Sequence, residues 1–185
     1  MTNLSSLQNE AAPVTGASRG IGRGIAVRLA RSRLAALLSL SYSASAGPAS
    51  KVVREIERTG SKAIALQVDC SDIKQIAGSS EKAIEHFGKR NVCNAGVESF
   101  GNIGEFTSEK FDRFFGLNTH GQFFVAQKAY KHISRGGRLI LMSSISANLR
   151  GVPGHSVYSV SKAAVEAFRR CLPEDLGSRK LLLLE

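Results

Sequence analysis

The stretch TGASRGIG, at residues 15–22, constrains the fold of this chain more strongly than any other feature of its sequence. Apolar residues lead into it, and Ile21, Ile25 and Leu29 then recur at the four-residue spacing of one helix face. This order predicts a strand, a glycine-rich turn and a helix. Pro13 lies in the predicted strand, where its missing N–H removes one hydrogen bond from a sheet ladder.

Each glycine of this turn has its own physical role. Gly16 permits a tight turn, Gly20 lets the backbone approach a ligand, and Gly22 allows the helix to pack closely on the strand. The N-terminus of a helix offers free N–H groups and a positive dipole end. The sequence therefore predicts a binding site for a pyrophosphate at this turn.

Further strands and helices alternate along the rest of the chain. The predicted strands lie at residues 34–43, 62–72, 91–96 and 136–144, and the predicted helices at residues 47–60, 72–88, 107–133 and 158–172. Strands that alternate with helices form a parallel sheet that the helices cover. The predicted fold class is an α/β doubly wound parallel sheet of the Rossmann type, with helices on both faces.

The length and composition suit one domain. A chain of 185 residues with 43% hydrophobic and 22% charged residues can bury a sizeable core. We expect residues 1–10 to be a polar N-terminal tail and residues 11–185 a single dinucleotide-binding and catalytic domain. The tail lacks the apolar region of a secretory signal, and no apolar run reaches membrane-spanning length. These features favour a cytoplasmic protein with no membrane partner.

Cysteine spacing and net charge bear on possible partners. Cys70, Cys93 and Cys171 lack the spacing of metal ligands, so we expect no metal and interpret them as small core residues in a reducing compartment. The net charge of +10 is dispersed, without the interleaved aromatic residues of a nucleic-acid-binding surface. We interpret it as a solvated basic surface, partly available to a phosphate ligand, and expect no nucleic-acid partner.

A Ser, a Tyr and a Lys near the C-terminal end of the chain suit proton transfer to a carbonyl oxygen. Tyr158 and Lys162 are four apart at the start of a predicted helix and so project from one face, while Ser144 ends a predicted strand. An unperturbed tyrosine phenol has a pKa of about 10, and a nearby cation favours its ionised form. In the simpler alternative Tyr158 packs, Lys162 is solvated and Ser144 merely ends the strand.

These motifs follow one another in a characteristic order. They are TGASRGIG, Asp69, NAG at Asn94 to Gly96, Asn118, Ser144, Tyr158 and Lys162. In this order they resemble the short-chain dehydrogenase/reductase family, over about residues 11–180. The stretches FDRFFGLNTHGQFFVAQKAYKHISRGGRLILMSSIS and VPGHSVYSVSKAAVEAFRRC are similar to the fungal trihydroxynaphthalene and versicolorin reductase subgroup, which reduces polyketide-derived aromatic ketones with NADPH.

The resemblance implies a hydride transfer between NADP(H) and a ketone or alcohol. It implies Tyr158 as the general acid–base and Lys162 as the cation that favours its ionisation and holds the nicotinamide ribose. It implies that Ser144, rather than Ser143, orients the carbonyl, and that Asn118 keeps a water in the proton relay.

The resemblance also implies a set of cofactor-binding residues. The pyrophosphate is assigned to Gly16, Ser18, Arg19, Gly20, Ile21 and Gly22, adenine to Asp69, and the lining of the cofactor to Asn94, Ala95 and Gly96 together with Tyr158 and Lys162. Taken singly, simpler interpretations stand beside these. Asp69 could cap the next helix, Asn94 could fill a turn, and Asn118 could interrupt a helix.

Charge decides the predicted form of the cofactor. A carboxylate at the end of the second strand would pair with a free ribose 2′-OH and favour NAD. That place reads SLSYSAS, without a carboxylate, and Arg19 in the glycine turn can face a 2′-phosphate. We therefore expect NADP(H).

Several positions depart from the family pattern. The family continues with two more strands and a segment that meets nicotinamide and substrate, whereas this sequence ends with KLLLLE, so we expect a C-terminally incomplete domain that lacks those strands. Residues 88–96 are about two residues short of the family's fourth strand, and Pro173 is expected to interrupt the last helix.

Two hypotheses of function stay open at this point. The first is an NADP(H)-dependent ketone reductase, and the second is a catalytically inactive remnant that binds nucleotide or pairs with a full-length relative. A homo-oligomer, either a dimer or a tetramer, is expected because the family pairs two helices that this sequence retains, at residues 107–133 and 158–172.

Overall fold

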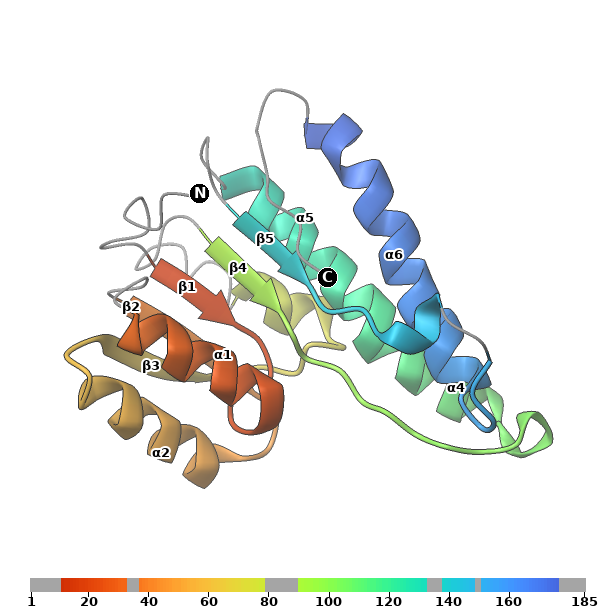
Figure 1. The fold of residues 1–185 in the computed structure, drawn as a ribbon, viewed down its shortest axis with the longest axis horizontal. Coiled ribbons are helices and arrows are strands. Elements are labelled where there is room, and N and C mark those ends of the chain that lie inside the picture. The colour runs from red at the N-terminus through yellow and green to blue at the C-terminus, as the bar shows by residue number, and fades with distance from the viewer. Residues whose placement is uncertain (1–10, 33–36, 79–89, 133–137, 149–150, 177–185) are drawn as a thin grey trace.

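The computed structural model describes residues 11–32, 37–78, 90–132, 138–148 and 151–176 (Figure 1). The strands are β1 (Ala11–Val14), β2 (Leu37–Tyr42), β3 (Lys62–Gln67), β4 (Arg90–Cys93) and β5 (Arg138–Leu141). The α-helices are α1 (Gly20–Arg31), α2 (Ala46–Glu57), α4 (Ser108–Phe115), α5 (Gln122–His132) and α6 (Ser156–Leu176), with a π-helical segment η3 (Gly116–Gly121) and short 3-10 helices η2 (Ile103–Glu105) and η4 (Ile145–Ala147). A helix also begins at residue 73, and its described part ends at residue 78.

The strands form one parallel sheet in the order β3-β2-β1-β4-β5, which confirms the predicted doubly wound α/β fold. From β1 the chain proceeds outward through β2 to β3, then returns to place β4 and β5 on the other side of β1. Ligands of such sheets bind at the carboxyl ends of the strands where this order reverses. The reversal lies between β1 and β4, so the segments after Val14 and Cys93 flank the expected ligand site.

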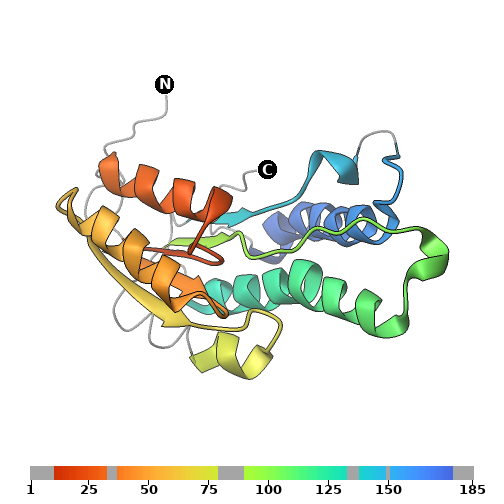
Figure 2. The same cartoon turned by 90° about the horizontal axis from the view of Figure 1, so that it is seen from below.

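The sheet has a hydrophobic core on each face. Val92 and Cys93 are adjacent in β4 and enter different cores, since successive strand residues point to opposite faces. One core includes Val14, Ala26, Ala30, Leu40, Val52, Ile56 and Val92; the other includes Ile76, Cys93, Val125, Ala129, Leu139, Leu141, Val165 and Leu172. Figure 2 shows α1 on one side of the strands and α5 on the other, which confirms helices on both faces.

Pro13 occupies the central strand without breaking the sheet. β1 pairs with β2 over four residues, with Pro13 opposite Ser39, whereas among the described residues its ladder with β4 is the single pair Val14 and Val92. The next residue, Thr15, donates its N–H to the Val92 carbonyl at 2.9 Å. Donors toward one neighbour alternate along a strand, so the missing N–H of Pro13 faces β4, and this ladder is correspondingly short.

Two predicted helices differ from the structure in their course. The helix expected over residues 107–133 is α4, η3 and α5, with wider π-type hydrogen bonding at Gly116–Gly121. The prediction that Pro173 interrupts the last helix was wrong, because α6 continues to Leu176. A proline removes a single helical hydrogen bond, which the following turn tolerates here. The predicted tail at residues 1–10 and the end at 177–185 lie outside the described residues.

Candidate active site

The glycine-rich turn joins β1 to α1 as predicted. Gly16 and Gly20 have φ values of +65° and +55°, which side chains rarely adopt. A Cβ at Gly22 would lie 2.5 Å from Asn94 Nδ2 and 2.6 Å from the Gly16 carbonyl, so this position requires glycine. Arg19 is the N-cap of α1, and its side chain makes no capping hydrogen bond. The first turn of α1 carries no acidic residue. This leaves helix N–H groups for an anion.

Asn94 and Thr15 fasten this turn to the end of β4. The Asn94 amide donates to the Thr15 carbonyl at 3.0 Å and to the Gly16 carbonyl at 3.4 Å. The Thr15 hydroxyl in turn accepts the Ala95 N–H at 2.9 Å. These hydrogen bonds therefore hold the start of the segment after β4 against the glycine turn. This contact goes beyond filling a turn and leaves the proposed lining role of Asn94 to Gly96 open.

Asp69 and Asp72 both follow β3, and they make different local hydrogen bonds. The Asp69 carboxylate accepts the Ser71 N–H at 2.9 Å and the Ser71 hydroxyl at 2.6 Å. The helix that begins at residue 73 is capped instead by Asp72, which accepts the Lys74 N–H at 2.8 Å. Asp69 therefore shapes a local turn, and its side chain is exposed beside the carboxyl ends of the strands.

Asn118 is fully buried in η3 and clamps the segment after β4. Its side-chain oxygen accepts the Val97 N–H at 2.8 Å, and its amide donates to the Val97 carbonyl at 2.9 Å and to the Ser161 hydroxyl at 3.2 Å. These contacts use both N–H donors of the side-chain amide and one lone pair of its oxygen. A water held by Asn118 would bind the second lone pair of that oxygen or the backbone carbonyl, which also accepts from Gln122 at 3.1 Å.

Tyr158 and Lys162 lie one turn apart on α6, with Lys162 Nζ 5.9 Å from the centre of the Tyr158 ring. The alternative in which Lys162 is solvated is wrong, since the residue is 4% exposed and its ammonium donates to the Met142 carbonyl at 2.8 Å. Burial lowers the pKa of Lys162 to about 8, because the charged form loses hydration. The ammonium is thus largely protonated at neutral pH but holds its proton weakly for a lysine.

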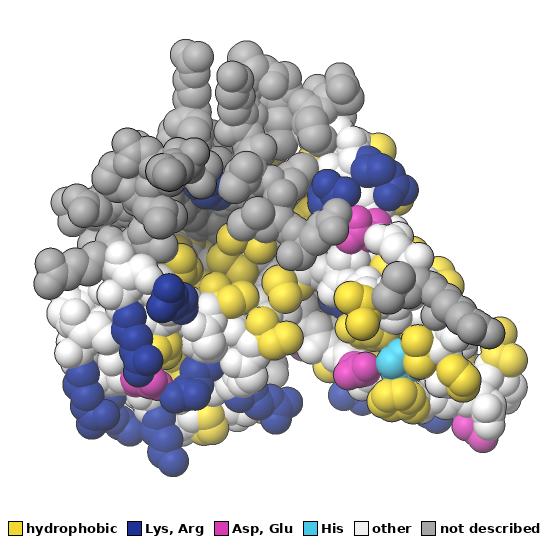
Figure 3. Space-filling view, in the orientation of Figure 1, with side chains coloured by type: hydrophobic (Ala, Val, Ile, Leu, Met, Phe, Trp, Pro, Cys, Tyr) yellow, Lys and Arg dark blue, Asp and Glu magenta, His cyan; other side chains and the backbone are white. Residues whose placement is uncertain are grey.

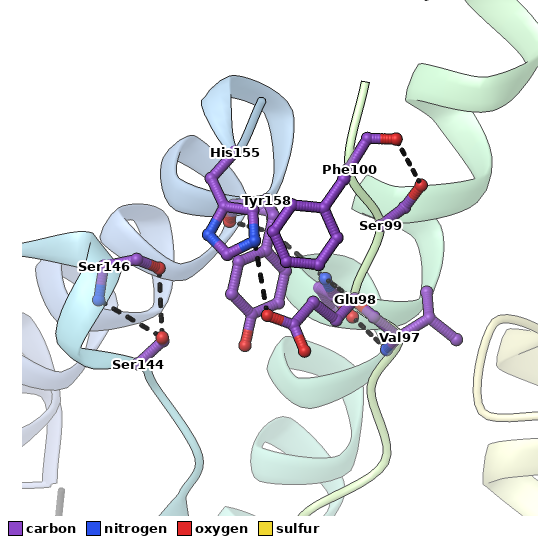
Figure 4. A network of polar contacts seen from close by, with 10 residues as sticks. Val97, Glu98, Ser99, Phe100, Ser144, Ser146, His155 and Tyr158 are labelled. Carbon is purple, nitrogen blue, oxygen red and sulfur yellow. Dashed lines mark hydrogen bonds and ion pairs between the residues drawn. The ribbon is translucent and has the colours of Figure 1, made fainter. Parts of the chain in front are cut away.

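The two serines after β5 have different partners. The Ser143 hydroxyl donates to the Lys162 backbone carbonyl at 3.2 Å, which ties β5 to α6. Ser144 caps η4, with its oxygen 3.2 Å from the Ser146 N–H and 3.0 Å from the Ser146 hydroxyl. Figure 4 shows the Ser144 hydroxyl together with the Tyr158 phenol, and the choice of Ser144 over Ser143 stays a prediction.

Gln122 is a buried residue of the site that the sequence motifs did not indicate. Its buried amide pairs with both backbone groups of Met142, donating at 2.9 Å and accepting at 3.0 Å. The Met142 carbonyl therefore receives both Gln122 and Lys162. The sequence contained one signal for Gln122, because a residue four positions after Asn118 lies on the same helix face.

The predicted site residues fall into connected groups. Gly96 lies between Asn118 and Lys162, since a Cβ there would be 3.1 Å from Asn118 Oδ1 and 3.4 Å from Lys162 Nζ. The glycine turn joins this group through Asn94. Ser18, Arg19 and Ile21 lie at the start of α1, where Arg19 and Ile21 are exposed, and the structure gives them no side-chain contact with the catalytic group.

The three cysteines differ in their burial. Cys70 and Cys93 are buried, and burial raises the pKa of both thiols. Cys171 is exposed, so the interpretation of all three as core residues was wrong.

Among the described residues no three His, Cys, Asp or Glu side chains form a potential metal site. Nor does any helix in the described part of the chain have the length and apolar character of a membrane span.

Comparison with known proteins identifies the family. The model of the short chain dehydrogenase family matches residues 10–183. The chain belongs to this family. Similar proteins include trihydroxynaphthalene reductase PfmaI of Pestalotiopsis fici, 48% identical over 96% of this chain and 63% of the relative, and versicolorin reductase 1 of Dothistroma septosporum, 45% identical over 95% and 66%. These names agree with the predicted subgroup, and the chain spans about two thirds of the length of these relatives.

Solved structures of the family share this fold closely. A short chain dehydrogenase from Burkholderia cenocepacia J2315 in complex with NADP has a TM-score of 0.90 at 36% identity, over 95% of this chain and 71% of that chain. The landomycin C-6 ketoreductase LanV with bound NADP and rabelomycin has a TM-score of 0.87 at 34% identity, over 96% and 74%.

Proposed function

We propose that this short chain dehydrogenase is an NADP(H)-dependent reductase of aromatic, polyketide-type ketones. The observation that carries the proposal is the buried Lys162 ammonium beside the Tyr158 ring. Ser144, which follows β5, belongs to the same group of side chains. The alternative of an inactive nucleotide-binding remnant is not favoured, because a remnant has no need for a buried lysine charge, which is costly to maintain.

The residues at the strand ends fit a dinucleotide. Gly16 and Gly22 let the turn pack closely against Asn94 and Ala95, a Cβ at Gly20 would meet nothing within 4 Å, and the uncapped start of α1 favours a pyrophosphate. Arg19 is exposed beside this turn, while β2 ends in Ser41 and Tyr42 without a carboxylate. This charge pattern favours a ribose 2′-phosphate over a free hydroxyl. The structural relatives with bound NADP support the same choice.

In this proposal the bound cofactor supplies a hydride to the carbonyl carbon, and the protein supplies the proton. Ser144 donates a hydrogen bond that orients the carbonyl oxygen, and the Tyr158 phenol gives that oxygen its proton. The Lys162 ammonium stabilises the phenolate that is left and, with its lowered pKa, can return a proton to it. Asn118 positions the segment Asn94 to Val97 and the start of α6 around this group.

Exposed apolar side chains on the segments that lead to the catalytic group support an aromatic substrate. Phe100, Ile103, Ile145 and Val152 are exposed on the segments that follow β4 and β5. Figure 3 shows apolar side chains gathered at this end of the molecule. Apolar walls with a few polar groups are typical of small-molecule sites. The names trihydroxynaphthalene reductase and versicolorin reductase among the relatives point to the same class of substrate.

The proposal is tested by mixing the purified chain with NADPH and a bicyclic aromatic ketone such as a hydroxytetralone. We expect NADPH consumption matched by formation of the alcohol. The assay is run on the 185-residue chain and on the same chain extended with the C-terminal third of PfmaI. If neither version forms the alcohol while both bind NADPH, the reductase proposal is wrong and a nucleotide-binding role takes its place.

A further inference from the structure

We propose that Glu98 is a specificity-determining residue, whose carboxylate accepts a hydrogen bond from a hydroxyl group on an aromatic ketone. This inference rests on the reductase function proposed above. Its basis is a cluster of Glu98, Phe100 and His155 against the Tyr158 ring, which the proton-transfer mechanism does not use.

Two segments far apart in the sequence hold this cluster together. The Gly101 N–H donates to the Gly154 carbonyl at 3.0 Å, which joins the segment after β4 to the segment before α6. Gly154 has a φ of +75°, and a Cβ there would lie 3.4 Å from the Gly101 nitrogen, so the two segments approach closely. Glu98 comes from the first segment and His155 from the second.

The imidazole of His155 is fixed by rings on two sides. The Phe100 ring centre lies 4.1 Å from that of His155 with an interplanar angle of 38°, and the Tyr158 ring meets it edge-on at 5.5 Å. His155 is 7% exposed, and among the described residues neither of its ring nitrogens has a hydrogen-bond partner. The imidazole therefore has little freedom to turn away from the group that faces its Nε2.

That group is the Glu98 carboxylate. One of its oxygens lies 3.4 Å from His155 Nε2, while the Glu98 side chain is 55% exposed. Figure 4 shows the carboxylate directed toward the imidazole. The contact at 3.4 Å is an ion-pair distance without a hydrogen bond, and a carboxylate can accept several hydrogen bonds. The Glu98 carboxylate thus has acceptor capacity left beside the imidazole that meets the Tyr158 ring.

The chemistry of this acceptor defines the ligand. A carboxylate offers no donor, so it attracts a hydroxyl and repels an anion. The exposed side chain of Phe100 accompanies it on the same segment and suits an aromatic ring. The cluster therefore selects uncharged ketones that carry a hydroxyl, and it disfavours keto acids.

The kinetic test compares tetralone with a hydroxytetralone. In Glu98→Leu the ratio of kcat/KM for the hydroxylated over the plain ketone should fall about 10- to 100-fold, the value of a hydrogen bond to a charged group. His155→Phe keeps a ring against Phe100 and should lower the ratio less. Glu57→Leu, an exposed position on α2, is the matched control and should leave the ratio unchanged. An unchanged ratio in Glu98→Leu would overturn the inference.

A binding experiment decides the matter without turnover. The chain contains four histidines, and the His155 Cε1–H resonance is assigned by its loss in His155→Phe. Naphthol should shift this resonance and bind about 10-fold more tightly than methoxynaphthalene, and Glu98→Leu should remove that difference. Equal binding of the two probes by the unmodified chain refutes the role of Glu98. If no ketone is reduced but naphthol is preferred, the reductase proposal fails and the hydroxyl site stands.

Discussion

Replacing Lys162 with methionine should stabilise the free protein at neutral pH. Lys162 is 4% exposed, and burial lowers its pKa from 10.5 to about 8. That shift corresponds to a cost of about 3 kcal/mol for keeping the ammonium in the folded protein. Methionine fills similar volume without a charge, and the Met142 carbonyl still accepts from Gln122 at 2.9 Å. We therefore expect Lys162→Met to raise the free energy of unfolding by up to about 3 kcal/mol at pH 7.

The sign of the pH dependence follows from proton binding. Between pH 8 and 10.5 the unfolded chain holds the Lys162 proton and the folded chain does not, so the free energy of unfolding of the unmodified protein rises with pH. The advantage of Lys162→Met should be full below about pH 8 and vanish near pH 10.5.

Urea unfolding of both proteins from pH 7 to 10 measures this difference, with the exposed Lys51→Met on α2 as control. The control should change stability by less than about 0.5 kcal/mol throughout. A Lys162→Met protein that is less stable at pH 7, or whose advantage does not change with pH, would refute the reasoning.

Three further predictions address the turn, the cofactor and the assembly. Gly22→Ala should lose roughly 1–3 kcal/mol of stability in urea unfolding, because its Cβ meets the Gly16 backbone, whereas Gly24→Ala, with nothing within 4 Å, should gain about 0.5–1 kcal/mol; equal effects would contradict the packing argument. NADPH should bind more tightly than NADH in fluorescence titration, and Arg19→Ala should reduce that preference; equal affinities in the unmodified protein remove the charge argument. The chain should sediment as a dimer or tetramer through α5 and α6, where Phe123 is exposed; a folded monodisperse monomer counts against this.

Local patterns were enough to predict the fold. Glycines at the turn before α1 and the repeat of Ile21, Ile25 and Leu29 reflect short-range geometry, so strand, turn and helix followed from them. The course of α4 to α5 did not follow, because helix propensity cannot show the π-type widening that places Asn118 against Val97.

The candidate site was predictable in its motif residues but not in its supporting contacts. Tyr158 and Lys162 share a helix face at a spacing visible in sequence. The burial of Lys162 was not visible in the sequence, because its ammonium donates to the carbonyl of Met142, twenty residues upstream. Gln122 and the pair of Glu98 and His155 are joined through tertiary contacts that no local pattern contains.

The central claim is that Tyr158 transfers the proton while Lys162 supports it. Its most direct test is a single-turnover reaction of the NADPH-bound protein with a hydroxytetralone, in the 185-residue chain and its extended form. Tyr158→Phe keeps the ring and removes the transferable proton, so the rate should fall at least about 100-fold with NADPH affinity nearly unchanged. Lys162→Ala should lose rate and cofactor affinity together, and the double variant should be little slower than either single variant. A Tyr158→Phe protein that keeps most of the rate in an active form of the chain would contradict the account.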